Sequence, residues 1–390
     1  MALLDRIDLN ELSASLKSLN LDGWLLYDFH GINPIARRVT GLGGLVTRRS
    51  YVWLPATGAP VILVHRIELS AVRDFPGEVR SYTTWQELER ELASIVRGRR
   101  VAMETAPEGA VPYLDRVPAG ALRVLERMGA VVRSSAPLVS RFAARWSQAE
   151  LEEHKATAEI LRSVALAVLG EAVREAGRLT ERELQRRVVE RLRAAGVEIT
   201  DPPIVAFGAN SAMPHYEPGS GGDVVLREGD VVLLDLWGRR SPGGVFADQT
   251  WMAFAGSQIP DDVARAWEAV RAARDAVIER LRSAHLSGGV LTGAELDAVA
   301  REVLARFGFG DAILHRTGHS IDAELHGSGP HLDGFETNDT RELIPGLGFS
   351  VEPAVYLEEK FGMRSEVNVY LGPGGPEVTP AEIQRELVHA

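Results

Sequence analysis

Acidic and imidazole side chains gather between residues 315 and 366 of the chain. Glu352 and Glu366 stand within otherwise apolar runs that are typical of strands, and His315, His319 and His326 precede them. A buried carboxylate needs a cation or strong hydrogen-bond donors to offset its lost hydration. The chain has no cysteine, so a metal held here would take its ligands from histidine and carboxylate. We therefore interpret this stretch as part of a metal site.

A sequence pattern that predicts a helix occurs twice, each time ahead of these acidic side chains or their counterparts. The pattern Leu-Thr-x-x-Glu-Leu opens the segment 179–196 and recurs 112 residues later at the start of the segment 291–308. Its Thr and Glu have the spacing of a capping box, in which both side chains satisfy unpaired amides at a helix start. Each segment closes on a glycine, which is typical of a helix C-terminus. We expect two equivalent helices.

A pair of acids follows each of these helices. Leu-x-x-Gly at 226–229 precedes an apolar run that ends at Asp235, and the same pattern at 343–346 precedes a run that ends at Glu352. A second acid then follows on the expected return strand of each copy. The sequence therefore predicts two related helix-plus-hairpin halves. The alternative is a coincidental match of leucines and glycines.

Packing of the halves about a pseudo-twofold axis would bring four carboxylates together, those of Asp235, Asp248, Glu352 and Glu366. Without cations these groups would repel one another, so they would either protonate or bind metal. Carboxylates that bridge two ions about 3.5 to 4 Å apart form a common hydrolytic site. One neutral imidazole would complete it. His319 is the candidate, because His315 and His326 are better placed to reach a substrate.

The remainder of the chain predicts two domains. Residues 1–146 are expected to form a mixed α/β domain, with a helix near 9–19, a strand at 24–27, a hairpin at 51–64 and a helix at 85–96. Residues 147–390 begin with a capping box at Ser147 and Glu150, and a long helix should follow.

Composition narrows the classes of partner. The 390 residues include 43 basic and 54 acidic side chains, giving a net charge of -11, which offers no general attraction to nucleic acid or anionic lipid. The N-terminal residues have neither a basic region followed by an apolar core nor a membrane-span pattern, so we expect a cytoplasmic protein. The helix face around Arg182, Arg186 and Arg187 is predicted to be solvated. His30 and His331 are predicted to lie at the surface or in loops.

The motifs together resemble those of the creatinase/methionine aminopeptidase (pita-bread) superfamily, and within it the Xaa-Pro aminopeptidase and prolidase branch. The resemblance covers about 240 of the 390 residues. It implies an α+β chain whose C-terminal pita-bread domain, residues 147–390, follows a smaller α/β domain, residues 1–146. It also implies five metal ligands, namely Asp235, Asp248, His319, Glu352 and Glu366. Asp235 would hold one ion, His319 and Glu352 the other, and the remaining two carboxylates would bridge them.

Further residues match the outer positions of this branch, and they suggest how catalysis would proceed. Glu352 would accept a proton from the attacking water and pass one to the leaving nitrogen. His326 would donate to the developing oxyanion, and His215 would help to hold the substrate, as would His315. Arg364 would either orient a ligand or meet a substrate carboxylate.

The sequence also departs from the family pattern. The interval from Asp235 to Asp248 is longer than usual, so residues 239–244 are expected to form an enlarged turn. Trp251 replaces a basic residue. An arginine that prolidases of the mammalian type place before the first ligand glutamate is absent, and Arg341 is predicted to bind the substrate carboxylate instead.

These expectations favour an Xaa-Pro dipeptidase with two divalent ions per chain, Mn²⁺ before Co²⁺ or Zn²⁺, acting on short proline-containing peptides. The preference for dipeptides depends on the modest N-terminal domain and on the available arginines. The alternatives are an Xaa-Pro aminopeptidase acting on longer peptides, a metal-free C–N hydrolase, and a non-catalytic binding protein with the same fold. A homodimer is expected from the habit of the family.

Overall fold

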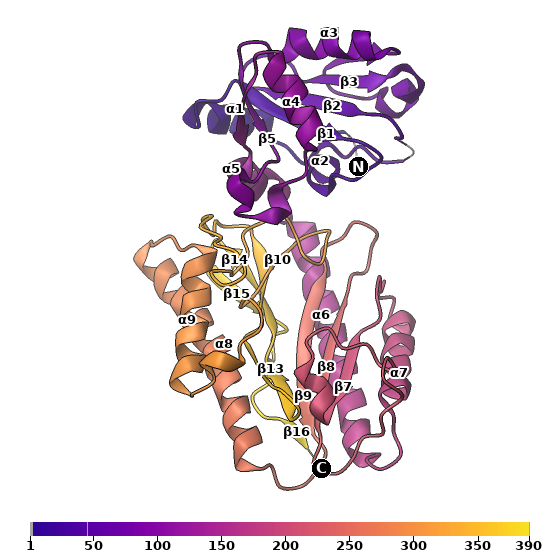
Figure 1. Ribbon diagram of the computed structural model, residues 1–390, viewed down its shortest axis with the longest axis vertical. Helices are drawn as coiled ribbons and strands as arrows, with labels where there is room; N and C mark the ends of the chain where they lie inside the picture. Colours follow the sequence, from indigo (N-terminus) through magenta and orange to yellow (C-terminus); the bar gives the residue numbers. More distant parts are fainter. Residues whose placement is uncertain (1–2, 45, 390) are drawn as a thin grey trace. The chain divides into compact units, whose positions relative to one another are not determined.

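A computed structural model of the chain describes residues 3–44 and 46–389 (Figure 1). The chain divides into two compact units, Met1–Ala144 and Arg145–Ala390. In the part of the chain that the structure describes, no helix combines the length and the apolar character that crossing a membrane requires.

The N-terminal unit contains a six-stranded mixed sheet in the order β4-β3-β2-β1-β5-β6. Its strands are β1 (Gly23–Asp28), β2 (Ser50–Pro55), β3 (Val61–His65), β4 (Glu78–Tyr82), β5 (Arg100–Met103) and β6 (Val131–Ser134). Its α-helices are α1 (Leu9–Ser18), α2 (Pro34–Thr40), α3 (Trp85–Val96), α4 (Ala119–Arg127) and α5 (Ala136–Leu138). Strands β1, β2 and β3 pair antiparallel, whereas the outer pairs are parallel. The hairpin and the helices predicted for this region are confirmed.

The C-terminal unit is built from two halves, which we define as α6 to β9 and α8 to β15. The first half contains α6 (Gln148–Arg174), α7 (Glu181–Ala194), β7 (Ile204–Phe207), the 3-10 helix η5 (Gly208–Ala212), β8 (Val231–Gly238) and β9 (Ala247–Phe254). The second contains α8 (Asp261–Ser287), α9 (Gly293–Arg306), β10 (Ser320–Ile321), β11 (Gly348–Val351), β12 (Ala354–Leu357), β13 (Phe361–Arg364), β14 (Val367–Gly372) and β15 (Gly375–Thr379). The short strand β16 (Val388–His389) pairs with β9 of the first half.

The two halves repeat in structure as the sequence predicts. Helices α6 and α8 each have 27 residues, and α7 and α9 each have 14. The glycines after α7 and α9, Gly196 and Gly308, have φ values of 75° and 83°, a left-handed conformation that favours glycine. The Leu-x-x-Gly turns also correspond, because Gly229 and Gly346 have φ values of 95° and 96°. The repeat is therefore a duplication of backbone geometry.

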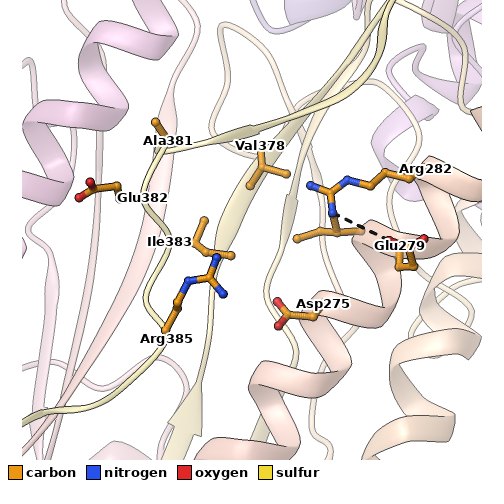
Figure 2. A pocket seen from close by; sticks show the side chains of 9 residues that line it. Asp275, Glu279, Arg282, Val378, Ala381, Glu382, Ile383 and Arg385 are labelled. Carbon is orange, nitrogen blue, oxygen red and sulfur yellow. Dashed lines mark ion pairs between the residues drawn. The ribbon is translucent and has the colours of Figure 1, made fainter.

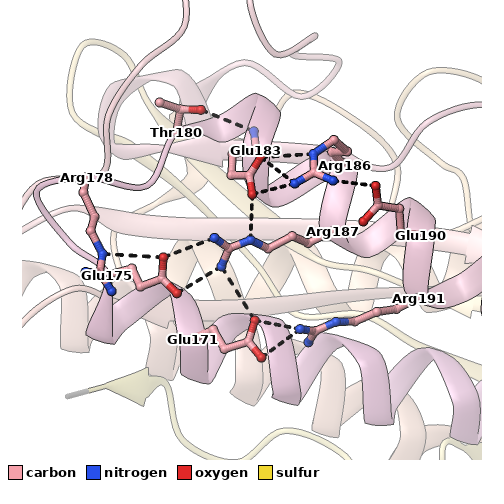
Figure 3. A network of polar contacts seen from close by, with 9 residues as sticks. All are labelled: Glu171, Glu175, Arg178, Thr180, Glu183, Arg186, Arg187, Glu190 and Arg191. Atoms are coloured by element: carbon pink, nitrogen blue, oxygen red, sulfur yellow. Dashed lines mark hydrogen bonds and ion pairs between the residues drawn. The ribbon is translucent and has the colours of Figure 1, made fainter.

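One of the three predicted capping boxes is incomplete, whereas the box of Ser147 and Glu150 at the start of α6 is formed. At the start of α9, the Thr292 hydroxyl and the Glu295 carboxylate satisfy each other's backbone amides. At the start of α7, the Thr180 hydroxyl accepts from the Glu183 amide, but the Glu183 carboxylate binds Arg186 and Arg187 instead (Figure 3). The arginines outcompete the capping interaction because each forms charge-assisted hydrogen bonds. Arg186 is exposed as predicted, whereas Arg187 is half-buried within this network.

The cores of the C-terminal unit join its two halves. On β9, Trp251 and Ala253 pack in the cluster beneath α6 and α7, whereas Met252 and Phe254 pack in the cluster beneath α8 and α9. Successive residues of a strand face opposite sides, so this strand is buried on both faces. In Figure 1, α6 and α7 lie on the outer side of one sheet, and α8 and α9 on the outer side of the other. The strands of both halves therefore meet at the centre of the unit.

Candidate metal centre

The strands of the C-terminal unit carry the four predicted acids to its centre. Asp235 on β8 lies opposite Thr250 on β9, and Asp248 lies two residues earlier on the same strand, so Asp248 and Thr250 share one face. Glu352 follows the last residue of β11, and Glu366 precedes the first residue of β14. All four carboxylates are buried, with at most 9% of any residue exposed.

His319 brings an imidazole to these acids. Its Nε2 lies 3.3 Å from Oδ2 of Asp248 and 3.4 Å from Oε1 of Glu352. Its Nδ1 lies 3.2 Å from the Ser320 carbonyl oxygen, so we assign the proton to Nδ1, which leaves Nε2 as a lone-pair donor. Ligand atoms of Asp248, His319 and Glu366 all lie within 4.8 Å of one another. These three residues could hold one ion together.

Arg364 and Thr250 link the other acids. Arg364 Nη2 donates to Asp235 Oδ2 at 2.5 Å, and its Nε donates to the Thr250 hydroxyl oxygen at 2.8 Å. The same hydroxyl donates to Glu366 Oε2 at 2.7 Å. This chain of hydrogen bonds fixes one oxygen of Asp235 and one of Glu366. Of the two roles predicted for Arg364, the geometry favours orientation of the ligands.

The remaining carboxylate oxygens test whether these residues fit a metal. Oδ1 of Asp235, Oδ1 of Asp248 and Oε1 of Glu366 are buried and have no hydrogen-bond partner among residues 3–44 and 46–389. Leaving a buried charged acceptor unsatisfied is costly, so such atoms call for a cation. Hard carboxylate oxygens with one imidazole form a donor set that suits divalent ions such as Mn²⁺ or Zn²⁺. The residues present therefore fit the metal that the sequence implies.

The electrostatics of the site lead to the same conclusion. Burial, reinforced by the neighbouring carboxylates, raises the pKa of Glu366 well above its ordinary value. Burial also raises the pKa of Asp235 to about 7, although Arg364 opposes it. For Glu352, burial raises the pKa, but the charges of His319 and nearby cations outweigh it, so the net direction is downward. The raised pKa values of Glu366 and Asp235 reflect a lack of positive charge near these two acids, which bound cations would supply.

The predicted outer histidines surround this cluster at different distances. The ring of His326 lies 4.3 Å from that of His319, edge to face, and its side chain is solvent-exposed. Burial, followed by the neighbouring His319 and Arg316, lowers the pKa of His326 to about 3, so its ring favours the neutral form. His215 is also exposed. His315 contacts the Tyr356 hydroxyl through Nε2 at 2.8 Å and the Arg316 carbonyl through Nδ1 at 2.7 Å. His326 and His215 are thus the two open to a ligand.

The segment that carries His215 is anchored at two points. Ser211 Oγ accepts from the Gly362 amide at 2.8 Å, and no larger residue fits at 362, because a Cβ there would meet the Ser211 carbonyl oxygen at 1.9 Å. The buried carboxylate of Glu181 accepts from the Tyr216 hydroxyl at 2.6 Å and from Asn210 Nδ2 at 3.0 Å. The backbone on both sides of His215 is therefore fixed.

Arg341 does not have the substrate-binding geometry predicted for it. Its Nε and Nη2 bind both oxygens of the buried Asp339, at 2.9 and 2.6 Å. Its Nη1 and Nη2 also donate to the carbonyl oxygens of Ser328 and Gly329, at 2.7 and 2.6 Å. All three nitrogens are thus committed within the protein, so we revise the prediction and assign Arg341 a structural role. The cause is Asp339, a buried acid that needs a charged partner.

Other residues of the site were misplaced or missed. His331, predicted to lie at the surface or in a loop, lies in a loop but is 1% exposed, and its Nδ1 accepts from the Ser320 amide. Thr250 received no role, although it stands two residues after Asp248 on the same strand face. Asn368 stands two residues after Glu366, and its Oδ1 accepts from the Asp248 amide at 2.9 Å. A polar residue two positions after an acid in an apolar strand was the available signal. Tyr356, which contacts His315, had no sequence signal.

The C-terminal unit has two related halves, and each half contributes acids to a common centre. This arrangement is typical of proteins that hold divalent metal between two halves. Residues 152–373 match the model of metallopeptidase family M24. The chain belongs to this family, and it is a metallopeptidase.

Individual relatives extend the likeness over most of the chain. The probable dipeptidase PepE of Mycobacterium tuberculosis is 28% identical over 319 residues, which cover 80% of this chain and 78% of the relative. The Xaa-Pro dipeptidase of Pyrococcus furiosus is 28% identical over 245 residues, which cover 61% of this chain and 63% of the relative. Among solved structures, dipeptidase PepE from Mycobacterium ulcerans has a TM-score of 0.78 at 23% identity, covering 98% of this chain and 96% of that one. The recombinant prolidase from Thermococcus sibiricus has a TM-score of 0.73 at 22% identity, with 100% of both chains covered. These structures share the fold and support the expected pita-bread class.

Proposed function

We propose that this metallopeptidase hydrolyses the Xaa-Pro bond of dipeptides with two divalent ions held between its halves. The observation that carries the hydrolytic part is the set of three buried, unpaired carboxylate oxygens of Asp235, Asp248 and Glu366. The names of the relatives support the dipeptide substrate, because they include an Xaa-Pro dipeptidase and a probable dipeptidase. Mn²⁺ is the proposed ion, with Co²⁺ or Zn²⁺ as substitutes.

Each protein group has a proposed task in this reaction. Ions held by Asp235, Asp248, His319, Glu352 and Glu366 would supply Lewis-acid activation of water and of the scissile carbonyl. Glu352 takes the proton from the attacking water and delivers it to the prolyl nitrogen as that bond breaks. His326, exposed beside His319, donates a hydrogen bond to the oxyanion, and His215 helps to bind the substrate. His315 supports the wall of the site through Tyr356.

A second candidate, an Xaa-Pro aminopeptidase, is favoured by one observation. The dipeptidase preference inferred from the sequence required arginines that could bind a free substrate carboxylate. Arg341 is committed to Asp339, and Arg364 is committed to Asp235 and Thr250. A longer peptide has no carboxylate at that position and would not need them. The cytoplasmic location and the homodimer expected from the sequence stay predictions.

The test is to remove metal with a chelator, restore Mn²⁺, and assay Ala-Pro, Gly-Pro and Ala-Pro-Ala side by side, with Ala-Ala as the control for proline specificity. We expect both proline dipeptides to be cleaved after Mn²⁺ is restored and Ala-Ala to be cleaved far more slowly. Faster cleavage of Ala-Pro-Ala than of either dipeptide would select the aminopeptidase. No cleavage of any peptide by protein that binds Mn²⁺ would contradict both candidates.

A further inference from the structure

A buried arginine on α8, Arg274, lies behind the metal centre. It is 1% exposed, which is rare for a charged side chain. Its Nη1 donates to Ser365 Oγ and to the Gln384 carbonyl oxygen, each at 2.8 Å. Its Nε and Nη2 donate to Oδ1 of Asp275, at 2.9 and 2.7 Å. A charge buried to this degree must be matched by its partners, so these contacts are strongly defined.

The first partner, Ser365, stands between two residues of the metal centre. Arg364 on one side orients Asp235, and Glu366 on the other is a candidate ligand. Ser365 is itself buried, and its amide donates to the carbonyl oxygen of Pro353, the residue after Glu352. A shift of Ser365 would therefore move Arg364 and Glu366 together.

The second partner, Gln384, connects Arg274 to the other half of the unit. The Gln384 side chain accepts from the Met252 amide at 2.9 Å and donates to the Met252 carbonyl at 2.7 Å. Met252 lies on β9, two residues after Thr250, which hydrogen-bonds Glu366. One guanidinium thus ties the Arg364–Glu366 segment of the second half to the segment that borders β9 of the first.

The third partner, Asp275, contributes less to this restraint. Asp275 lines an open groove of ≈ 760 Å³ between α8 and the segment 378–385, where Figure 2 shows it across from Arg385 and Ile383. Its side chain is 42% exposed, so solvent screens its attraction for Arg274. The two buried acceptors, Ser365 Oγ and the Gln384 carbonyl, therefore fix the position of the guanidinium.

We propose that Arg274 is a positioning residue of the metal centre, which fixes Arg364 and Glu366 through Ser365 and thereby sets the affinity for metal. Hydrogen-bond partners of metal ligands commonly change metal affinity by about 10- to 100-fold when they are lost. The kinetic part of this inference rests on the proposed function, whereas the metal-affinity part does not.

The experiment compares Arg274→Met with Arg271→Met, a matched control. Arg271 lies on the same helix and also faces Asp275, at 3.8 Å, but its side chain is 36% exposed. For each purified full-length protein we would measure Mn²⁺ affinity by competition with a fluorescent chelator, the Tm with and without Mn²⁺, and kcat and KM for Ala-Pro. We expect Arg274→Met to weaken Mn²⁺ binding by about 10- to 100-fold. The rise in Tm on adding Mn²⁺ should shrink accordingly. Arg271→Met should stay within about twofold of wild type.

Two further variants keep the inference testable if Arg274→Met does not fold. Ser365→Ala removes only the acceptor hydroxyl, and we expect Mn²⁺ binding to weaken by about 10-fold, the lower end of the range for a lost hydrogen-bond partner. Arg274→Lys keeps the charge and should retain tighter Mn²⁺ binding than Arg274→Met. Mn²⁺ affinity within twofold of wild type in Arg274→Met, or in Ser365→Ala if the former is unfolded, would overturn the proposal. Wild-type protein that binds Mn²⁺ but cleaves no peptide would refute the proposed function alone, because the affinity comparison would still decide the role of Arg274.

Discussion

The two halves of the C-terminal unit share a backbone but carry different chemistry. In the first half, β8 and β9 each have eight residues, and Asp235 and Asp248 lie within them. In the second, β11 has four residues and β14 has six, the hairpin of β12 and β13 lies between them, and Glu352 and Glu366 stand just beyond the strand ends. Glutamate has one more methylene than aspartate, so it can reach a common centre from a more distant backbone. The two halves thus share a repeated backbone, and the choice of aspartate or glutamate compensates for the different strand lengths.

The halves also support each other reciprocally. Thr250, two residues after Asp248, hydrogen-bonds the Glu366 carboxylate of the second half. Asn368, two residues after Glu366, accepts from the Asp248 amide of the first half. The imidazole is not reciprocal. His319 immediately precedes β10, whereas Pro203 immediately precedes β7, the equivalent partner strand. Both halves therefore contribute to the centre, but only the second contributes an imidazole.

The largest effect should come from removing, from either half, one of the acids that are expected to bridge the ions. We expect Asp248→Asn and Glu366→Gln each to lower kcat/KM for Ala-Pro by at least about 1,000-fold, because each removes a charge that holds the proposed ions. Steady-state kinetics at saturating Mn²⁺ checks this, with Glu358→Gln, an exposed acid, as the control. Retention of a tenth of the activity by either variant would show that the halves do not contribute equally.

Substitutions of Thr250 and Asn368 should have smaller effects, and the two effects on Mn²⁺ affinity should differ. Thr250→Val keeps the side-chain shape but removes the hydroxyl between Arg364 and Glu366, so Mn²⁺ affinity should fall by about 10- to 100-fold. Asn368→Ala should cost less, because Asn368 holds a backbone amide and not a ligand carboxylate. Calorimetric titration with Mn²⁺ checks both, and Thr250→Ser should restore most of the affinity. Equal losses in the two variants would contradict this ranking.

A buried histidine that links the halves predicts a pH effect on stability. His154 on α6 contacts the Phe246 carbonyl through Nδ1 and the Thr379 hydroxyl through Nε2, both at 2.8 Å. Burial lowers its pKa to about 4 from 6.5, so the unfolded chain binds more protons between these values. Stability should therefore fall as pH decreases from 6.5 toward 4, by roughly 3 kcal/mol from this group.

Urea unfolding across this pH range is the measurement for His154. His154→Gln should have a shallower pH dependence than wild type, and His285→Gln, at an exposed histidine, should match wild type. Identical slopes for His154→Gln and wild type would refute the assignment.

The smallest effect on catalysis is expected at Arg341. Arg341→Lys loses the two-point contact with Asp339, so the Tm should fall, but KM for Ala-Pro should stay within about twofold of wild type. Thermal unfolding and kinetics measured on the same preparation separate the two effects. A tenfold rise in KM at an unchanged Tm would show that Arg341 binds substrate.

Local signals in the sequence predicted the frame of the site well. The threonines at the helix starts, the glycines at 196 and 308, and the Leu-x-x-Gly turns encode backbone geometry over a few residues, and the structure follows them. The approach of the four carboxylates could be inferred from the repeat, because the same offset in each half implies the same place in the fold.

Contacts between distant segments could not be predicted in the same way. Arg341 was assigned to substrate because it lay near the expected position. Its nitrogens are instead taken by Asp339, two residues away, and by the carbonyl oxygens of Ser328 and Gly329, which only the folded loop brings close. Arg274 lies 91 residues from Ser365, in a helix whose pattern only predicts burial. Glu183 shows the limit even for a local motif, since the neighbouring arginines take the carboxylate that the capping box requires.

The central claim is that one metal centre forms from both halves, and counting bound ions tests it most directly. Equilibrium dialysis of metal-free protein against Mn²⁺, followed by elemental analysis, should give two ions per wild-type chain. Asp235→Asn in the first half and His319→Ala in the second should each bind fewer than two under the same conditions. Two ions at wild-type affinity in either variant, or none in the wild type, would contradict the account.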